Sequence, residues 1–287
     1  MAEGILQCLY DHKVAEKVTY IIVERNPHQQ KRQMELLNNY PQIKWARGLS
    51  DIRTFSGVVV SNELVDAFPV HLVQFHKGEF YEVFVDLSEK GEFIEVLKPL
   101  SDELKEYTER YKIPRIEGYR TEINLQIRGF LSEVSKYLQE GFLLTIDYGY
   151  PYWAYYAEER TQGTLLCYHR HRSNDNPYIN IGQQDITAHV NFTFMDDAGR
   201  KYGFKTIGFT PQGTFLTSLG IDQIMTELLQ KDPAFINEIQ KIKGLLWGMG
   251  ESHQVLLQYK GPLKEVPLPR GFQLRNRAYN LQRSMDG

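Results

Sequence analysis

The stretch Val18-Thr-Tyr-Ile-Ile-Val-Glu24 decides the fold class of this chain. Its β-branched and aromatic residues form an apolar run that ends at an acid, which is typical of a strand buried on both faces. Upstream, the apolar spacing of residues 4–10 predicts a helix, and downstream Pro27 is well placed to open another. Ile43-Lys-Trp45 and Gly57-Val-Val-Val-Ser61 predict two more strands. This order of elements indicates half of a parallel α/β sheet.

The segment after residue 69 has a different pattern. Three stretches alternate apolar and polar side chains and predict the strands of an antiparallel meander: 70–75, 79–86 and 93–96. Helices are predicted at 104–111 and 123–139, and Gly141 is a natural C-terminal cap for the second. We therefore expect residues 69–140 to insert a meander and helices into the α/β frame.

The stretch Phe142-Leu-Leu-Thr-Ile146 predicts a third buried strand, which ends at Asp147. Residues 151–182 carry few regular signals, so we expect a loop there around a strand at 164–168. Three helices and a closing strand are expected further on, at 213–219, 222–229, 233–242 and 255–259. Residues 150–287 are thus expected to form a C-terminal substrate or cap part.

The composition excludes several classes of protein. A net charge of −3 and a pI near 6.3 do not give the basic surface of a nucleic-acid-binding protein. The apolar runs are far shorter than the roughly 20 residues that cross a bilayer. Cys8 and Cys167 form no CxxC pair, which suits a reducing cytosol, and the N-terminus lacks the order of a signal peptide. We therefore expect a cytoplasmic protein without nucleic-acid binding or membrane insertion.

The three predicted strands all end in residues that can bind a ligand: Glu24, Asn62-Glu63 and Asp147. We expect these strands to form one parallel, Rossmann-like sheet with their carboxyl ends on one rim, where ligands of open α/β sheets bind: 18–24, 57–61 and 142–147. Glu24 lies 20 residues after Gly4, a spacing typical of the acid that accepts from both ribose hydroxyls. The alternatives are that Glu24 caps the next helix and that Asp147 starts a turn.

A longer motif follows the strand at 57–61. Asn62-Glu-Leu-Val-Asp-Ala-Phe-Pro-Val-His71 resembles the NE-x-x-DA-x-PV signature of the MidA-like methyltransferases, the family of a mitochondrial complex I assembly factor that methylates an arginine. Five further matches follow in the same order: Glu117-Gly-Tyr-Arg-Thr-Glu-Ile-Asn124, Asp147-Tyr-Gly149, Gly163-Thr-Leu165, Gln184-Asp-Ile-Thr-Ala-His-Val190 and Gly248-Met-Gly-Glu251. Six matches in order are specific for a family, and less specific for a substrate.

The resemblance implies a class I methyltransferase sheet with the inserted meander and C-terminal helices. Residues 1–287 would then form a single S-adenosylmethionine-dependent methyltransferase domain that acts on a protein side chain, with arginine as the expected acceptor. The implied cofactor is S-adenosyl-L-methionine. The implied partner is a protein substrate, for which the family points to a respiratory-complex subunit, and a homodimer is left open.

The resemblance also implies the residues that hold the cofactor. Glu24 would bind the ribose, and Gly4 would leave room for the cofactor to approach the backbone. Asp51 and Ile52 would contact the adenine, where an acid can accept from the amino group. The alternative for Asp51 is a helix N-cap. Asn62 would lie at the reacting edge of the site.

Three residues are the candidates for catalysis. A guanidinium stays protonated, so an arginine acceptor needs carboxylates that pair with it and orient it. Glu63 and Asp66, three residues apart on an expected helical turn, could supply that pair. The alternative is that Asp66 only stabilises the turn before Pro69. His189 is implied as a base near neutral pH, and the alternative is a satisfied core histidine.

The chain also departs from the family pattern. Only Gly4 remains of the family's first motif, E-x-G-x-G-x-G, so we expect an N-terminally incomplete domain with a weakened cofactor cradle. Asn191 stands where the family often has Asp, and Ser252-His253 stands where it often has Arg-Phe. These departures leave open an inactive binding or assembly module. An NAD or nucleotide-sugar enzyme fits the acids and the meander poorly. No metal site is expected, because His169-Arg-His-Arg172 lacks a third ligand at suitable spacing.

Overall fold

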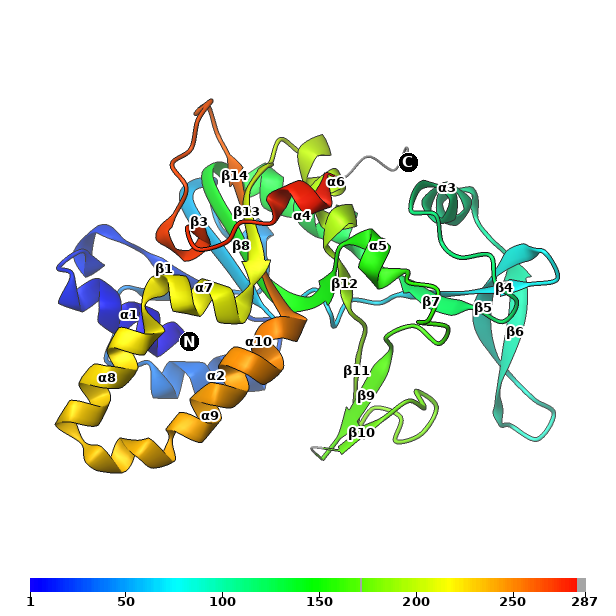
Figure 1. Ribbon diagram of the computed structural model, residues 1–287, viewed down its shortest axis with the longest axis horizontal. Coiled ribbons are helices and arrows are strands. Elements are labelled where there is room, and N and C mark those ends of the chain that lie inside the picture. Colours follow the sequence, from blue (N-terminus) through cyan, green and yellow to red (C-terminus); the bar gives the residue numbers. More distant parts are fainter. Residues whose placement is uncertain (171, 283–287) are drawn as a thin grey trace. The chain divides into compact units, whose positions relative to one another are not determined.

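The computed structural model describes residues 1–170 and 172–282 (Figure 1). Its chain divides into two compact units. The first unit comprises residues 1–56 and 136–139, and the second comprises residues 57–135 and 140 onward. A single methyltransferase domain made of both units stays a prediction. Within the described residues, no helix is long and apolar enough to span a bilayer.

The first unit is a β-α-β arrangement with an additional helix at its start. Its elements are α1 (Ala2–Asp11), η1 (Ala15–Lys17), β1 (Tyr20–Val23), α2 (Pro27–Leu36), β2 (Ile43–Ala46) and η2 (Leu49–Asp51). β1 and β2 pair in parallel, as the buried-strand patterns predict. The Asn26 side chain caps α2 and Pro27 occupies its first turn, which is why the helix begins there. A small core holds the unit together, with Leu6, Leu37 and Ile43 buried.

The second unit is built on a mixed sheet (Figure 1). Its strands are β3 (Phe55–Asn62), β8 (Leu138–Tyr150), β12 (Val190–Asn191), β13 (Lys205–Pro211) and β14 (His253–Lys260). β14 runs antiparallel to β8 along one edge and also pairs with β13. β3 and β12 pair with β8, which places them on its other edge. Phe142, Leu144 and Ile146 of β8 pack on a buried core formed by Val255, Leu257 and Phe272.

β3 runs in the same direction as β8. Gly57 lies against Gly141 at one end of the pair, and Ser61 donates to Thr145 further along, 3.4 Å away. Gly141 has a φ of +143°, and a Cβ there would come within 1.8 Å of the Gly57 carbonyl oxygen. The close approach of these two strands therefore requires glycine. The predicted parallel neighbours β3 and β8 are thus present, and both carboxyl ends point to one rim. The single parallel sheet predicted from all three strands is not found in the described residues, because β1 pairs with β2 in a sheet of two strands and the central sheet is mixed.

The inserted meander is confirmed as a separate antiparallel sheet, visible in Figure 1 apart from the central sheet. Its strands pair in the order β6 (Phe93–Pro99), β5 (Glu79–Leu87), β4 (His71–His76) and β7 (Arg120–Ile123). The two predicted helices are α3 (Asp102–Arg110) and α4 (Gln126–Tyr137). β7 was not predicted, because its four residues, Arg-Thr-Glu-Ile, carry no alternating pattern long enough to recognise.

The loop predicted for residues 151–182 is wrong in part. After α5 (Tyr152–Tyr155), three short strands form an antiparallel sheet in the order β10 (Arg172–Asn174), β9 (Leu166–His169) and β11 (Asp185–Thr187). α6 (Phe192–Lys201) and β13 were also not predicted. α6 is amphipathic, and seven of its ten residues are buried, so its helical period is present in the sequence although it was not predicted.

The C-terminal helices were predicted at nearly the right places. They are α7 (Gln212–Leu219), α8 (Ile221–Lys231), η3 (Pro233–Asn237), α9 (Ile239–Lys243), η4 (Gly244–Gly248) and α10 (Met249–Ser252). β14 then closes the central sheet, and the 3-10 turns η5 (Arg270–Phe272) and η6 (Ala278–Leu281) follow. Phe272 packs beneath Gly208 of β13, which leaves no room for a side chain there.

Candidate active site

The carboxyl ends of β3 and β8 gather most of the predicted catalytic residues. Asn62 is the exposed last residue of β3, and Glu63 follows it. The Glu63 N–H donates to the Ile146 carbonyl of β8 over 2.9 Å. Glu63 has a φ of +48°, in the left-handed region that residues with a side chain seldom adopt. Such strain is concentrated at functional sites, so it marks Glu63 as a candidate.

A tight turn follows Glu63 rather than the expected helical turn. Asp147 holds it: Oδ2 accepts from the N–H groups of Val65, at 2.9 Å, and Asp66, at 3.3 Å. Its Oδ1 accepts from the Tyr148 N–H at 3.0 Å. The expected helix is absent because these donors bond to the Asp147 side chain instead of to backbone carbonyls. Asp147 therefore does start a turn, as the alternative proposed, but the turn is the one that carries the predicted catalytic acids.

The acids at this edge affect one another's ionisation. Burial first, and then the nearby Asp66 carboxylate, raise the pKa of Asp147 to about 7, against the opposing effect of three backbone N–H donors. Burial also raises the pKa of Asp66; a hydrogen bond with Tyr148 opposes this, and Glu63 adds to it. The Oδ1 atom of Asp66 is buried without a hydrogen-bond partner. A buried polar atom without a partner is costly, so this edge is suited to a ligand that donates.

Two histidines lie beside these acids, both in contact with Tyr148. The Tyr148 ring meets His253 edge-on with 4.5 Å between ring centroids, and meets His189 at 5.9 Å. The Nε2 atom of His253 lies 3.3 Å from Oε1 of Glu63. Burial and the nearby acids, Asp66 first among them, raise the pKa of the Tyr148 hydroxyl well above its usual value. The Tyr148 phenol therefore stays protonated and can donate.

His189 is in place but is poorly suited to act as a base. Burial first, and then the charges of Arg160 and His253, lower its pKa to about 4. It is therefore neutral at physiological pH and binds a proton weakly, unlike the base near neutral pH that the resemblance implied. Its Nδ1 atom is buried without a partner. We conclude that His189 can accept a hydrogen bond at this edge more readily than it can take a proton.

A fully buried acid supports the site from β7. Oε1 of Glu122 accepts from the Leu165 N–H, and its two oxygens both lie within reach of the Thr164 N–H. Its Oε2 accepts from the Thr164 hydroxyl at 2.9 Å and from Tyr155 at 3.3 Å. Thr164 Oγ1 in turn accepts from the His189 N–H at 3.0 Å. Glu122 thus fixes the segment that carries His189.

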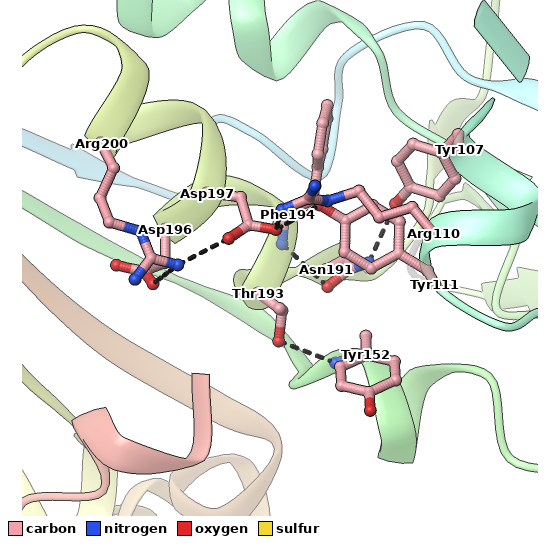
Figure 2. Close-up of polar contacts among 10 residues, drawn as sticks. All are labelled: Tyr107, Arg110, Tyr111, Tyr152, Asn191, Thr193, Phe194, Asp196, Asp197 and Arg200. Carbon is pink, nitrogen blue, oxygen red and sulfur yellow. Dashed lines mark hydrogen bonds and ion pairs between the residues drawn. The ribbon is translucent and has the colours of Figure 1, made fainter. Parts of the chain in front are cut away.

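A second network anchors α6, immediately after the His189 segment (Figure 2). The Asn191 side chain caps α6 by accepting from Phe194 N–H and donates to the Tyr107 hydroxyl at 2.9 Å. Asn191 therefore fulfils the capping role that an aspartate could also fill. Asp197 accepts from Arg110, the last residue of α3, and from the hydroxyl of Tyr111, which follows the helix. These contacts fix α6 to the neighbouring helix.

The predicted cofactor residues Gly4, Glu24, Asp51 and Ile52 all lie in the first unit. Glu24 follows β1, and its two oxygens accept from the Asn26 N–H and from Gln33. A carboxylate has about four acceptor sites, so capacity for a ribose hydroxyl remains. Asp51 accepts from the backbone of its own turn only through Oδ2, so it caps that turn and keeps Oδ1 for a ligand. Gly4 lies in α1 with open space around it, which permits a close approach but does not demand glycine.

An apolar hollow of the second unit lies elsewhere. It has a volume of about 250 Å³ and lies between the central sheet and the chain around α7 and η5. Its lining is almost wholly apolar, and Arg270 is its one charged residue. Without an acid, a base or a strained residue, it offers packing surface but no chemistry. We therefore place the site at the strand ends. The loop His169-Arg-His-Arg172, where no metal site was expected, includes position 171, which lies outside the described residues.

Sequence reasoning missed three residues that shape this site: Glu122, Tyr148 and His253. Glu122 and Tyr148 lie within the quoted motifs, which could have signalled them. His253 was noted only as a departure from the family pattern. It reaches Glu63 because β14 pairs with β8, and that pairing joins residues more than a hundred positions apart. No local pattern carries such information.

The chain matches known proteins over most of its length. Residues 1–210 match the family described as "Putative S-adenosyl-L-methionine-dependent methyltransferase". The mitochondrial protein arginine methyltransferase NDUFAF7 homolog of Drosophila melanogaster is 24% identical over 240 residues, which are 76% of this chain and 51% of that protein. The Caenorhabditis elegans homolog is 27% identical over 196 residues, or 66% of this chain and 43% of its own. The chain thus spans about half the length of these curated relatives.

Two crystal structures of a protein from Burkholderia thailandensis are similar to this fold. One has S-adenosyl-homocysteine bound, and the other is native. Both superpose with a TM-score of 0.88 at 31% identity and cover 97% of this chain, against 72% and 75% of the respective crystal chains. The predicted Rossmann-like methyltransferase fold is confirmed, as is S-adenosylmethionine as the cofactor of this fold. The chain belongs to the MidA-like family of S-adenosyl-L-methionine-dependent methyltransferases.

Proposed function

We propose that this chain transfers a methyl group from S-adenosylmethionine to a protein side chain, and that the acceptor is arginine. The observation that carries the proposal is the acidic edge at the ends of β3 and β8. There Glu63 presents a carboxylate whose side chain is 41% exposed, beside the buried Asp66, whose Oδ1 has no partner. Two acids with free acceptor capacity suit a cationic group with several donors.

Arginine chemistry explains why carboxylates would be needed. A guanidinium is protonated at all relevant pH values and has five N–H donors in a fixed plane. Carboxylates at Glu63 and Asp66 can hold this plane and draw positive charge toward the nitrogens they contact. The remaining nitrogen is then oriented for attack. Alignment of this kind can supply several kcal/mol of the barrier reduction.

The first unit offers residues for the cofactor. Glu24 would hold the ribose and Asp51 the adenine amino group, since both keep acceptor capacity beyond their own contacts. When bound, S-adenosylmethionine supplies a methyl group already activated by its sulfonium. The protein therefore has to orient the acceptor and exclude water rather than generate a strong nucleophile.

Support for arginine as the acceptor comes from the relatives. Those of Drosophila melanogaster and Caenorhabditis elegans are named protein arginine methyltransferases, at 24% and 27% identity. Their names also place those proteins in mitochondria, so a cytoplasmic location for this chain stays a prediction. The same holds for a respiratory-complex subunit as substrate and for a homodimer.

The proposal is tested by Glu63→Gln. The substitution keeps the shape of the side chain and removes its charge. An interaction with a charged group is worth roughly 1.5–3 kcal/mol, so we expect methyl transfer to fall about tenfold to a hundredfold. The assay follows labelled methyl groups from S-adenosylmethionine into arginine-containing peptides, with methylarginine identified by mass spectrometry. Glu109→Gln, an exposed acid of α3, serves as the matched control and should leave turnover unchanged.

Calorimetry completes the test. S-adenosylhomocysteine should bind the unaltered chain and the Glu63→Gln variant with similar affinity, while NAD should bind neither. For Glu24→Gln, the main expected effect is weaker binding of S-adenosylhomocysteine. If the unaltered chain bound no S-adenosylhomocysteine, the inactive binding module would be the better description. Unchanged turnover in Glu63→Gln would show that Glu63 is structural and that the acceptor site lies elsewhere.

A further inference from the structure

His253 is held in one place by the sheet and by an aromatic neighbour. It is the first residue of β14 and pairs in register with Tyr148 of β8. The Tyr148 ring packs edge-on against it, with 77° between the ring planes. Only 3% of His253 is exposed. The imidazole therefore has little freedom to move, and its two nitrogens point in fixed directions.

Those two nitrogens meet one serine and one acid. Nδ1 lies 3.3 Å from the hydroxyl of Ser252, and Nε2 lies 3.3 Å from Oε1 of Glu63. With the proton on Nε2, His253 donates to the Glu63 carboxylate. Tyr148, from β8, and His189, from the segment before β12, also lie near this pair, and Asp66 interacts with both Tyr148 and Glu63. The pair thus has polar and aromatic neighbours from several segments of the second unit.

Glu63 is held from two directions as a result. Its backbone is fixed by the hydrogen bond to Ile146 and by the left-handed turn. Its side chain is fixed at Oε1 by His253. Within the described residues, the one polar contact of the Glu63 carboxylate is at Oε1. The second oxygen, Oε2, belongs to a side chain that is 41% exposed, and so it can meet an incoming donor.

We infer that His253 is a positioning residue, which orients the Glu63 carboxylate so that its second oxygen binds a cationic acceptor. This inference rests on the proposed function, and it identifies His253 as the residue that keeps the Glu63 side chain of the acceptor site rigid. A free glutamate would lose side-chain freedom when it pairs with a guanidinium. Because His253 has already restricted Glu63, that loss is largely avoided, and the acceptor binds more tightly.

A pair of substitutions separates the hydrogen bond from the packing. His253→Phe keeps a ring that packs on Tyr148 and removes the donor. His253→Gln removes the ring but keeps an N–H donor at about the position of Nε2. The loss of a hydrogen bond to a charged group predicts that His253→Phe lowers kcat/KM for the arginine peptide about tenfold, mainly through KM. His253→Gln should recover most of this loss. S-adenosylhomocysteine binding and Tm should change little in His253→Phe.

A double variant tests whether the two residues act together. If His253 acts through Glu63, then His253→Phe should cause no further loss in a Glu63→Gln background. Independent, multiplicative losses would overturn the inference. So would a His253→Phe variant with unchanged KM, or one that loses S-adenosylhomocysteine affinity and Tm together, since either outcome shows a purely structural histidine. If the unaltered chain transfers no methyl group to arginine peptides, the proposed function itself fails, and the positioning role fails with it.

Discussion

Glu122 and Asp66 are both buried carboxylates of the second unit, but their surroundings are opposite. Glu122 is 1% exposed, and both of its oxygens accept from the chain at Thr164 and Leu165. Asp66 is 3% exposed, has one oxygen without a partner and lies near two other acids. The first carboxylate has its acceptor capacity filled by the fold. The second has capacity left over.

The two regions are connected, and the connection shows why both are needed. Glu122 holds Thr164, whose hydroxyl oxygen accepts from the His189 N–H. Two residues after Glu122, Asn124 donates to the Val65 carbonyl in the turn that carries Asp66. The contacts around Glu122, which we call the satisfied region, therefore support the turn with Asp66 and Asp147, which we call the unsatisfied region. A fold can keep acids together at a ligand site only if neighbouring contacts stabilise the backbone that presents them.

The largest loss of stability should come from removing the Glu122 carboxylate from the satisfied region. In Glu122→Gln the amide NH₂ would face backbone donors, so at least one buried N–H group would lose its acceptor. The cost of a buried unsatisfied group predicts a loss of about 2–3 kcal/mol in the free energy of unfolding. Urea denaturation measures it.

The matched control for this change is Glu103→Gln. Glu103 pairs with Arg128 through a side chain that is 50% exposed. Exposed ion pairs contribute about 0–1 kcal/mol, so the control should lose less than that. Equal losses in the two variants would contradict the claim that Glu122 is a special contact of the fold.

In the unsatisfied region, the raised pKa of Asp147 should make the free energy of unfolding depend on pH. The folded-state pKa of Asp147 is raised to about 7, from an ordinary value of 3.8. The folded state thus holds the Asp147 proton between these values and the unfolded state does not. The contribution of Asp147 to the free energy of unfolding is therefore largest below about pH 4 and is lost as the pH rises through 7.

Asp66→Asn should flatten this decline, because it removes the negative charge that helps to raise the Asp147 pKa. Each pKa unit by which Asp147 falls corresponds to about 1.4 kcal/mol. In urea denaturation, the free energies of unfolding at pH 5 and pH 8 should therefore differ less in Asp66→Asn than in the unaltered chain. The same pH dependence in both proteins would mean that the two acids do not interact.

The smallest effect is expected at the α6 anchor. Asp197 is 10% exposed at its side chain and pairs with Arg110 and Arg200, which are both almost half exposed (Figure 2). Ion pairs of this kind are weakened by solvent, so Asp197→Asn should cost about 1 kcal/mol. Asp102→Asn, at a fully exposed acid of α3, should cost nothing measurable. A loss at Asp197 as large as that at Glu122 would show that burial does not decide which acids hold the fold.

The sequence by itself determined several of the strands and the positions of the acids. Apolar runs such as 18–23 and 142–146, and the polar residues that end them, are local features that hydrophobic patterning reveals. The meander was recognisable for the same reason. Of the two runs, the pattern predicted burial correctly only for 142–146, because Val18 and Val23 are exposed. Quoted motifs also located Asn62, Glu63 and Asp66 correctly at the end of a strand. Their roles in catalysis stay predictions.

The tertiary structure alone decided which of these residues meet and how they ionise. The antiparallel pairing of β14 with β8 brings His253 to Glu63 across 190 positions of the chain. The helical turn expected after Glu63 gave way to a turn bonded to Asp147. The raised pKa of Asp147 and the lowered pKa of His189 depend on desolvation by distant residues. Burial is a property of the folded chain, so a local pattern cannot contain it.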